Sequence, residues 1–441
     1  MLLAVVGLNW GDEGKGRMVD NLSADADYVV RYHGGSNAGH TIHTDQGKFK
    51  LHSLPSSVMR PEVTSILGPG MTVDIEGLLA ELDALAEHGV HPERLLVSHQ
   101  ASVCFPFHRD LDAAEEERLS HGQYGSTRKG ISPAYGDRVM KKTLLVGELF
   151  DKESLPARLA SVVDWANERI EKIYGGTPLL LADVERWAAD VRERLEPHVV
   201  DVTRLLTEAL AQDATVLAEG QLGALRDLYF GIYPFTTSSN CLAGHAPVGM
   251  GIPWAKVDRT VGVTKAFSSC VGAGPFVTEF DEERADRLRR QWGEYGSTTN
   301  RPRRLGAFDA VATRYGARMQ GADAIAITNL DQLTGTGELQ VCSGYERDGR
   351  PVAEFTTSPA ELARMKPVYE TFAGWDEDIS GARRYDELPR ATRAYVEGIQ
   401  RLLGVPVRYV SVGSHRDALI EIETETETET GTGTGTGTEG N

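Results

Sequence analysis

Residues 2–19, LLAVVGLNWGDEGKGRMV, decide the fold of this 441-residue chain. The apolar run at 2–7 predicts a buried strand, and a helix is predicted to begin near Lys15, with Met18 and Val19 on its inner face. A glycine-rich turn between a strand and a helix can bind phosphate, because backbone N–H groups and the helix N-terminus point toward the anion. The sequence therefore predicts a phosphate-binding loop directly after the first strand.

This loop departs from the standard phosphate loop, GxxxxGK[ST]. Asn9 stands where that motif has its first glycine, and Gly16 stands where it has the hydroxyl residue that holds magnesium. A generic phosphate-loop ATPase is therefore disfavoured, and another group must bind the metal. Asp12, inside the loop, is the candidate carboxylate. The plainer alternative is a strand–helix turn in which Asp12 and Glu13 are only solvated acids.

Strand-like and helix-like stretches alternate along the rest of the chain. Further strands are predicted at 28–32, 215–218, 324–328 and 407–411, and helical patterns at Leu78, Leu82 and Leu85, over 183–212, over 307–320 and at Val396, Ile399 and Leu403. This alternation predicts an α/β fold with a mostly parallel central sheet and helices on both faces. We also expect smaller inserted subdomains and, because of the glycine-rich loop after the first strand, a phosphate-loop-like nucleotide-binding architecture.

The composition argues against several classes of protein. A formal net charge of −18 opposes nucleic acid as the main partner, because neutralising phosphate drives that binding. No apolar run approaches the roughly 20 residues of a membrane span, and the N-terminus lacks the pattern of a signal peptide. The four cysteines are scattered, without a CxxC pair, which favours a reducing compartment. We therefore expect a cytoplasmic protein without a membrane or nucleic-acid partner.

The end of the chain differs in composition from the rest. Residues 421–441 consist mainly of Glu-Thr and Gly-Thr dipeptides, which offer too little apolar surface to offset the entropy of ordering. We predict one catalytic domain over 1–420 and a low-complexity, disordered tail over 421–441.

A second polar cluster, HGGSNAGHT at 33–41, follows the second predicted strand. Loops at the carboxyl ends of neighbouring parallel strands meet in one crevice, so Asp12 and His40 are expected to lie together. A carboxylate can act there as a base and an imidazole as an acid. The alternative for His40 is an ordinary polar loop residue.

Two later stretches also have the chemistry of a binding site. GSTTNRPRR at 296–304 combines hydroxyls with arginines, whose planar forks bind carboxylates, although a solvated basic turn is the alternative. Thr328-Asn329-Leu330-Asp331 follows an apolar strand, and Asp331 could accept hydrogen bonds from guanine N1–H and its 2-amino group.

Taken together, these stretches resemble the adenylosuccinate synthetase family. The segments WGDEGKG, GGSNAGHT, KGISPAYGDRV, YPFTTSSN, VGAGPF and STTNRPRR occur in the family's order, over about residues 1–420. The resemblance implies a ligase of AMP biosynthesis that joins aspartate to the 6-position of IMP. GTP and Mg²⁺ are required, and adenylosuccinate, GDP and phosphate form through a 6-phosphoryl-purine intermediate.

The resemblance also implies roles for single residues. Asp12 would take the proton from purine N1, His40 would be the catalytic acid, and Asp12 with the Gly39 carbonyl would hold magnesium. The GTP and phosphate contacts implied are Gly11, Glu13, Gly14, Lys15, Gly39, Thr41, Arg303, Asn329, Asp331, Ser411 and Gly413. The IMP contacts implied are Asn37, Thr127, Lys141, Gln221, Leu222, Thr237, Val271 and Arg301. Aspartate would bind Thr298, Thr299 and Arg301, and the family forms a homodimer in which Lys141 would be lent to the neighbouring subunit.

Several positions depart from the family pattern. Leu222 replaces a glutamine that reads the purine, with Gln221 shifted by one, and Lys141 replaces an arginine. Asn300 replaces a glycine, and Asn329 replaces a lysine that covers the guanine. These changes leave open a divergent paralogue acting on a modified purine-like nucleotide in nucleoside natural-product biosynthesis, or a non-catalytic nucleotide-binding paralogue. The retained pair Asp12 and His40 favours the aspartate ligase.

Overall fold

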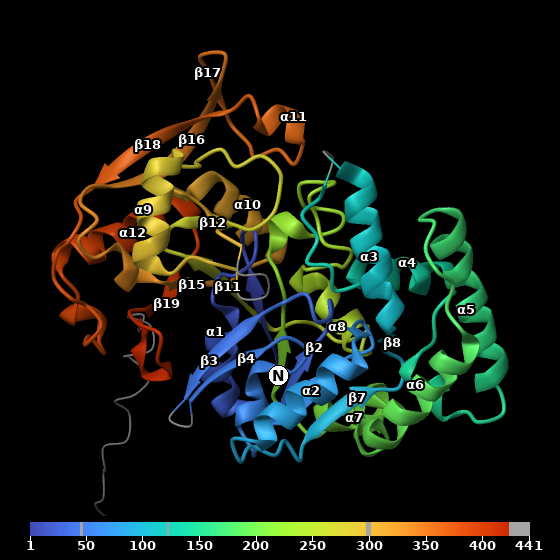
Figure 1. Cartoon of the computed structure of the whole chain (residues 1–441). Coiled ribbons are helices and arrows are strands. Elements are labelled where there is room, and N and C mark those ends of the chain that lie inside the picture. Colours follow the sequence, from blue (N-terminus) through green and yellow to red (C-terminus); the bar gives the residue numbers. More distant parts are fainter. Residues whose placement is uncertain (45–46, 121–122, 297–300, 423–441) are drawn as a thin grey trace, which may run out of the picture.

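The computed structural model describes residues 1–44, 47–120, 123–296 and 301–422, with the backbone alone at 40–44 and 48 (Figure 1). A ten-stranded sheet forms its centre, in the order β20-β19-β15-β11-β1-β10-β2-β5-β7-β9. In that order the strands are Leu419–Glu421, Val407–Ser411, Ala324–Thr328, Arg259–Lys265, Leu2–Gly7, Val216–Glu219, Tyr28–Arg31, Thr64–Leu67, Leu95–Ser98 and Val199–Val200. Every neighbouring pair is parallel except β19 and β20. The predicted mostly parallel sheet is confirmed.

Alternate residues of the strands face opposite layers of helices, as the two-residue period of a strand requires. On one face, Val5 and Val29 pack against Met18 of α1 (Lys15–Leu22). On the other face, Val6 and Val30 belong to the cluster that includes α7 (Val202–Leu210) and α8 (Ala246–Gly249). Helices therefore cover both faces, as predicted.

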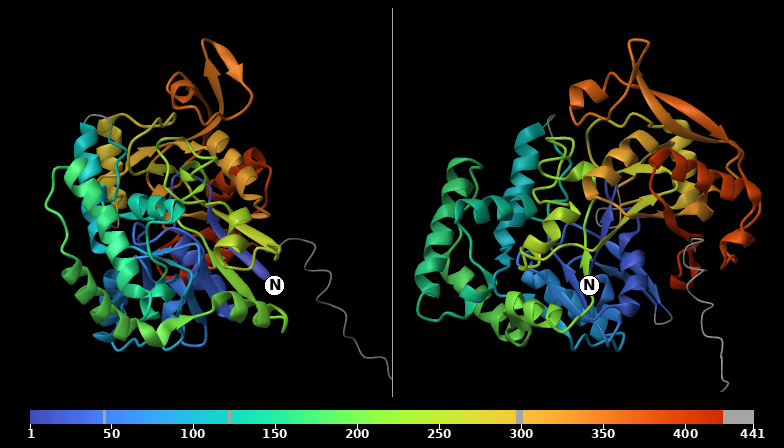
Figure 2. Two further views of the ribbon diagram at one scale, coloured as in Figure 1. Left: turned by 90° about the vertical axis from the view of Figure 1, so that its right-hand side faces the viewer. Right: turned by 180° about the vertical axis from the view of Figure 1, so that it is seen from behind.

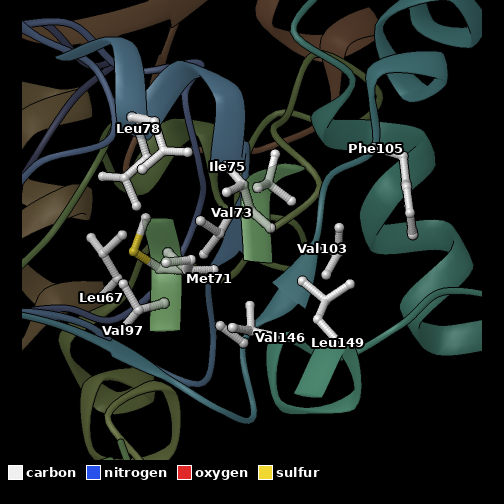
Figure 3. Packing of buried hydrophobic residues seen from close by; sticks show 14 of the residues in the cluster. Leu67, Met71, Val73, Ile75, Leu78, Val97, Val103, Phe105, Val146 and Leu149 are labelled. Atoms are coloured by element: carbon white, nitrogen blue, oxygen red, sulfur yellow. The ribbon is translucent and has the colours of Figure 1, made fainter. Parts of the chain in front are cut away.

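A helical region packs around the end of the sheet that contains β7 and β9, toward the right in Figure 1 and toward the left in the second view of Figure 2. It comprises α2 (Ile75–Ala86), α3 (Pro106–Leu119), α4 (Ile131–Met140), α5 (Leu155–Lys172) and α6 (Leu181–Leu195). Figure 3 shows how Val97 of the sheet, Ile75 of α2 and Phe105 before α3 share one apolar cluster with Val146 and Leu149. This packing fixes α3 and α4 beside the sheet.

Smaller elements complete the chain. Two further helices, α10 (Ala310–Gln320) and α12 (Arg390–Leu403), pack on the β15–β19 side together with α9 (Glu282–Trp292). A separate antiparallel unit, orange in Figure 1, contains β16 (Leu339–Arg347), β17 (Arg350–Val352) and β18 (Lys366–Phe372), with α11 (Pro359–Leu362) next to it. The remaining strands are β3 (His40–Thr44), β4 (Gly47–Leu51), β6 (Thr72–Val73), β8 (Ser102–Val103), β12 (Ser268–Cys270), β13 (Arg304–Gly306) and β14 (Phe308–Asp309).

The structure differs from the predicted elements in three places. The helix predicted over 307–320 begins only at Ala310, because Phe308–Asp309 form β14 and the Asp309 side chain caps the helix. The helical stretch expected over 183–212 is broken, because Pro197 follows the end of α6, β9 joins the sheet, and the Asp201 side chain caps α7. At the other end, β20 runs to Glu421, and Ile422 packs against the core. The folded part thus extends two residues past the predicted start of the tail, and the rest of the tail prediction concerns residues outside those described.

None of the described helices is both long and apolar enough to span a membrane. All four cysteines are buried and form no disulfide.

Candidate functional site

A cavity of about 790 Å³ opens where the carboxyl ends of β1, β2, β10, β11 and β15 meet. Its lining comes from the loops that follow these strands and from α3 and α4. Crevices of this size at the carboxyl edge of a parallel sheet are where α/β proteins bind nucleotides. The loops after these five strands, which carry several of the predicted site residues, therefore meet at one cavity.

The loop after β1 has the backbone of a phosphate-binding turn. Gly11, Asp12 and Gly14 have positive φ angles of 102°, 58° and 85°, and Gly14 caps α1. A Cβ on Gly11 would lie 3.2 Å from the Cα of Leu222, so a glycine is required for this close approach as well as for its φ. The turn places Asp12, Lys15 and the α1 N-terminus on the cavity wall.

The Glu13 side chain holds the backbone of this loop in place. Its Oε1 accepts the backbone N–H groups of Asn9 (3.1 Å) and Gly11 (2.8 Å), and its Oε2 lies 2.5 Å from Nζ of Lys15. Glu13 is buried and does not line the cavity, whereas Lys15 does. Glu13, which was predicted to contact phosphate, instead holds the backbone of the loop that would bind the phosphate.

Asp12 lies at one end of a chain of four charged side chains. Arg303 donates to Asp12 Oδ2 at 3.0 Å from Nη2 and 3.2 Å from Nε, and its Nη1 donates to Glu294 at 2.7 Å. The Nζ of Lys265 then donates to both Glu294 oxygens, at 2.7 and 2.9 Å. Burial raises the pKa of Asp12, but Arg303, Lys265 and Lys15 outweigh it, so the pKa lies below its ordinary value.

The same network sets the charge of the other members. Burial favours neutral Glu294, yet Lys265 and Arg303 hold the pKa of its carboxyl below the ordinary value. Burial lowers the pKa of Lys265 and Glu294 opposes this change. Lys265 and Glu294 line the cavity, and the sequence interpretation missed both. A lysine at the carboxyl end of the apolar strand 259–265 was the signal that could have found Lys265.

The turn after β2 also lines the cavity. Asn37 and Gly39 line the same cavity as Asp12, and β3 begins with the next residue, His40. The backbone therefore brings position 40 next to the cavity that contains Asp12. The side chains of His40 and Thr41 lie outside the described residues, so the predicted pairing of Asp12 with His40 stays a prediction.

The wall assigned to the purine nucleotide is formed by Thr127, Leu222, Thr237 and Val271, which all line the cavity. Leu222 has a φ of 52°, unusual for a residue with a Cβ. Gln221 points elsewhere: its side chain is buried and donates to the carbonyls of His33 (2.7 Å) and Gly35 (3.3 Å). The structure therefore does not support the predicted contact of Gln221 with the purine, because the side-chain amide N–H groups of Gln221 hold the loop after β2.

Several residues that were predicted to bind the triphosphate form a second group around Arg17, at the edge of the cavity. Arg17 and Asn329 line the cavity, and the Arg17 guanidinium contacts Ser411 Oγ. Burial lowers the pKa of Arg17, whereas the nearby Asp331 carboxylate raises it. Ser411 Oγ donates to the Gly413 carbonyl at 3.1 Å. Asp331, Ser411 and Gly413 are thus linked to the cavity through Arg17, although they do not line it.

Comparison with known proteins agrees with this geometry. The family model described as adenylosuccinate synthetase matches residues 4–420. The chain is 42% identical over 418 residues to an adenylosuccinate synthetase of Desulforamulus reducens, which covers 95% of this chain and 98% of the relative. It is 44% identical to adenylosuccinate synthetase 2 of Pseudoalteromonas translucida, with 95% and 99% covered. The fully ligated adenylosuccinate synthetase from Plasmodium falciparum superposes with a TM-score of 0.90 at 33% identity, covering 96% of this chain and 99% of that one.

The chain belongs to the adenylosuccinate synthetase family.

Within this family assignment, some predicted contacts lie away from the cavity or outside the described residues. Arg301 is exposed and its Nη1 lies 3.5 Å from the Gly125 carbonyl, and it does not line the cavity. Thr298 and Thr299, the predicted aspartate contacts, are outside the described residues. Lys141 is exposed at the C-terminal end of α4, also off the cavity.

The residues present fit a magnesium ion that is completed by substrate. No group of three or more His, Cys, Asp or Glu side chains suited to a metal occurs in the described part of the chain. Mg²⁺ is usually bound by one or two carboxylates together with substrate phosphates, and needs no all-protein cage. Asp12 and Gly39, which both line the cavity, offer a carboxylate and a backbone carbonyl of that kind.

Proposed function

We propose that this adenylosuccinate synthetase family member ligates aspartate to the 6-position of IMP, with GTP as the energy source. One observation carries the proposal: Asp12 and Lys15, the Asn37–Gly39 turn and the purine wall line a single cavity at the carboxyl edge of the sheet. The family assignment and relatives about 40% identical over nearly the whole chain support the same reaction. These consistent names do not favour a divergent or silent paralogue.

The chemistry follows from the charges around Asp12. An ionised carboxylate there can accept the purine N1 proton, which moves negative charge onto O6. O6 then attacks the γ-phosphorus of GTP and the bond to the β-phosphate oxygen breaks, so GDP leaves, with His40 as the acid that assists the transfer. The aspartate amine displaces the resulting 6-phosphate, because phosphorylation turns a poor leaving oxygen into a good one. Lys15 and the α1 N-terminus lie where they can hold the triphosphate during this step.

Arg303 has to release Asp12 before the base can act. A carboxylate paired with a guanidinium has a lowered pKa and is a weak base. Glu294 already binds Arg303 Nη1, so it can retain Arg303 when the pair with Asp12 opens. When bound, Mg²⁺ would be held by Asp12, the Gly39 carbonyl and the GTP phosphates, and would neutralise their charge.

The proposal includes an assembly and a location. Two copies would form a homodimer, each lending Lys141 to the nucleotide phosphate of the other, in the cytoplasm. Lys141 keeps the charge of the arginine usual at this position but loses its bidentate fork.

A product assay tests this function. The protein is incubated with Mg²⁺, aspartate, GTP and IMP, and succinylated nucleotide is measured by mass spectrometry. We expect product from the parent, and none from Asp12→Ala or His40→Asn, while GTP binding survives. Asp25→Ala, which removes an exposed carboxylate just after α1, is the matched control and should keep the parental rate. Product from Asp12→Ala at the parental rate would contradict the assigned role.

A further inference from the structure

Arg226 is a buried cation in the wall of the cavity that the sequence interpretation did not single out. It ends the short helix Ala224–Arg226, four residues after Leu222, and lines the cavity. Only 8% of the residue is exposed. An arginine this deeply buried needs partners for its N–H groups, and their identity shows what the side chain holds in place.

The guanidinium joins two segments of the wall. Its Nη1 donates to the Phe235 carbonyl and, at 3.4 Å, to the Ala273 carbonyl. Its Nη2 donates to the Val271 carbonyl at 2.8 Å and lies 3.0 Å from Cys270 Sγ. The backbone carbonyl of Arg226 accepts the Thr237 N–H at 2.8 Å. One residue thus connects the 235–237 and 270–273 segments with the loop that carries Leu222.

The charge of Arg226 has no carboxylate partner in the described part of the chain. Four other cations that line the cavity, Lys15, Arg169, Lys265 and Arg303, each form an ion pair with a carboxylate, and Arg17 interacts with Asp331. No ion pair of Arg226 occurs among the described residues, so carbonyl dipoles alone offset its charge. A buried charge without a carboxylate partner is costly, and the carbonyls that Arg226 binds would lose their donor if it were removed. Arg226 therefore holds these segments in place and adds a positive charge to the cavity wall that no carboxylate among the described residues compensates.

We propose that Arg226 is a positioning residue for the purine mononucleotide. It fixes the Thr237 and Val271 walls relative to Leu222, and it gives this part of the cavity a positive charge suited to an anionic nucleotide. The inference rests on the proposed function, since it takes IMP as the ligand of this wall. Because Arg226 acts on the nucleotide wall and lies apart from the Asp12 network, its effect should fall on nucleotide binding more than on turnover.

Two substitutions separate the parts of this role. Arg226→Met keeps a long apolar stem but removes all of the guanidinium bonds and the charge. We expect it to raise the KM for IMP at least tenfold, with kcat within threefold and the KM values for GTP and aspartate within twofold. Arg226→Lys keeps the charge but cannot reach both segments, so its KM for IMP should lie between those of the parent and Arg226→Met.

Arg304 offers a matched control. It donates to the Gly272 carbonyl at 3.5 Å, inside the 270–273 segment that Arg226 holds, and to the next carbonyl, that of Gly274, at 2.7 Å, but it pairs with Glu279 and does not line the cavity. We expect Arg304→Met to change the KM for IMP less than twofold. An increase equal to that of Arg226→Met would show that any loosening of this segment has the same effect, and would overturn the specific role of Arg226.

Direct binding keeps the test independent of turnover. IMP is titrated by calorimetry into the parent, Arg226→Met and Arg226→Lys, with melting temperatures measured in parallel. Affinity at least tenfold lower in Arg226→Met, with the lysine variant intermediate, supports the inference even if the parent makes no product, in which case only the proposed reaction fails. Equal IMP affinity in the parent and Arg226→Met would overturn the inference and leave the reaction untouched.

Discussion

At the scale of single residues, the site depends on the balance of charge around Asp12. Two cations, Arg303 and Lys265, face two carboxylates, Asp12 and Glu294, within one chain of contacts. Glu294 is the member that binds both cations. It therefore controls how strongly Arg303 and Lys265 act on Asp12.

Neutralising Glu294 should weaken the base. In Glu294→Gln, Arg303 and Lys265 would lose the carboxylate that they share. Their positive charges would then act more strongly on Asp12 and lower its pKa further below its present value. We expect kcat to fall at least tenfold, with the KM for GTP changed less than threefold, measured by steady-state kinetics. Glu279→Gln, which removes the partner of Arg304 outside the cavity, is the control. An unchanged kcat in Glu294→Gln would exclude this role.

These residue-level contacts mark the limit of what the sequence alone could predict. Asp12 and Lys15 could be placed, because a loop between a strand and a helix has few geometries. Gln221 could not, since its orientation follows from the left-handed backbone of the next residue, Leu222, and from carbonyls in another loop. Glu294 could not either, because only the fold brings it to Lys265.

At the scale of elements, α10 supports the junction between β1 and the phosphate-binding loop. Gly316 of α10 lies so close to this junction that a Cβ would be 1.9 Å from the Leu8 carbonyl oxygen. The apolar pattern predicted the strands and α10 well, since each has a continuous buried face. It did not predict the break between α6 and α7, which a proline and a capping aspartate impose.

A methyl group at position 316 should separate these two elements. In Gly316→Ala, backbone atoms on both sides must move, so we expect a loss of about 2–4 kcal/mol in the free energy of unfolding. Chemical denaturation measures it. Gly321→Ala is the control: it has a φ of 61° with no atom within 4 Å of the added Cβ, so only backbone strain of about 1 kcal/mol applies. Equal losses in the two variants would contradict direct packing of α10 on the loop.

At the scale of the whole molecule, the proposed dimer makes each cavity dependent on two chains. Lys141 ends α4 next to Val139 and Met140, which are 79% and 47% exposed. Exposed apolar residues beside a cation that is off its own cavity are consistent with a surface that a second copy covers. The sequence indicated this role only through resemblance, because no local pattern describes a contact between chains.

Mixed dimers test whether Lys141 acts in the neighbouring subunit. As homodimers, Asp12→Ala should make no product and Lys141→Ala should be weak. When the two are co-expressed, the heterodimer contains one site with both residues intact, so roughly a quarter of the parental activity should return if the chains pair at random. Product formation by the co-expressed pair is compared with the sum of the separate variants. Activity no higher than that sum would contradict a shared site.

The contact between Arg303 and Asp12 has a consequence for the order of events in a catalytic cycle. In the proposed mechanism, in which Asp12 is the base, a purine that enters while the guanidinium occupies the carboxylate would keep its proton and could not accept phosphate. Only after Arg303 has turned away would O6 become reactive. In such an enzyme the nucleophile would form last, so an active site with only some of its substrates bound would not consume GTP.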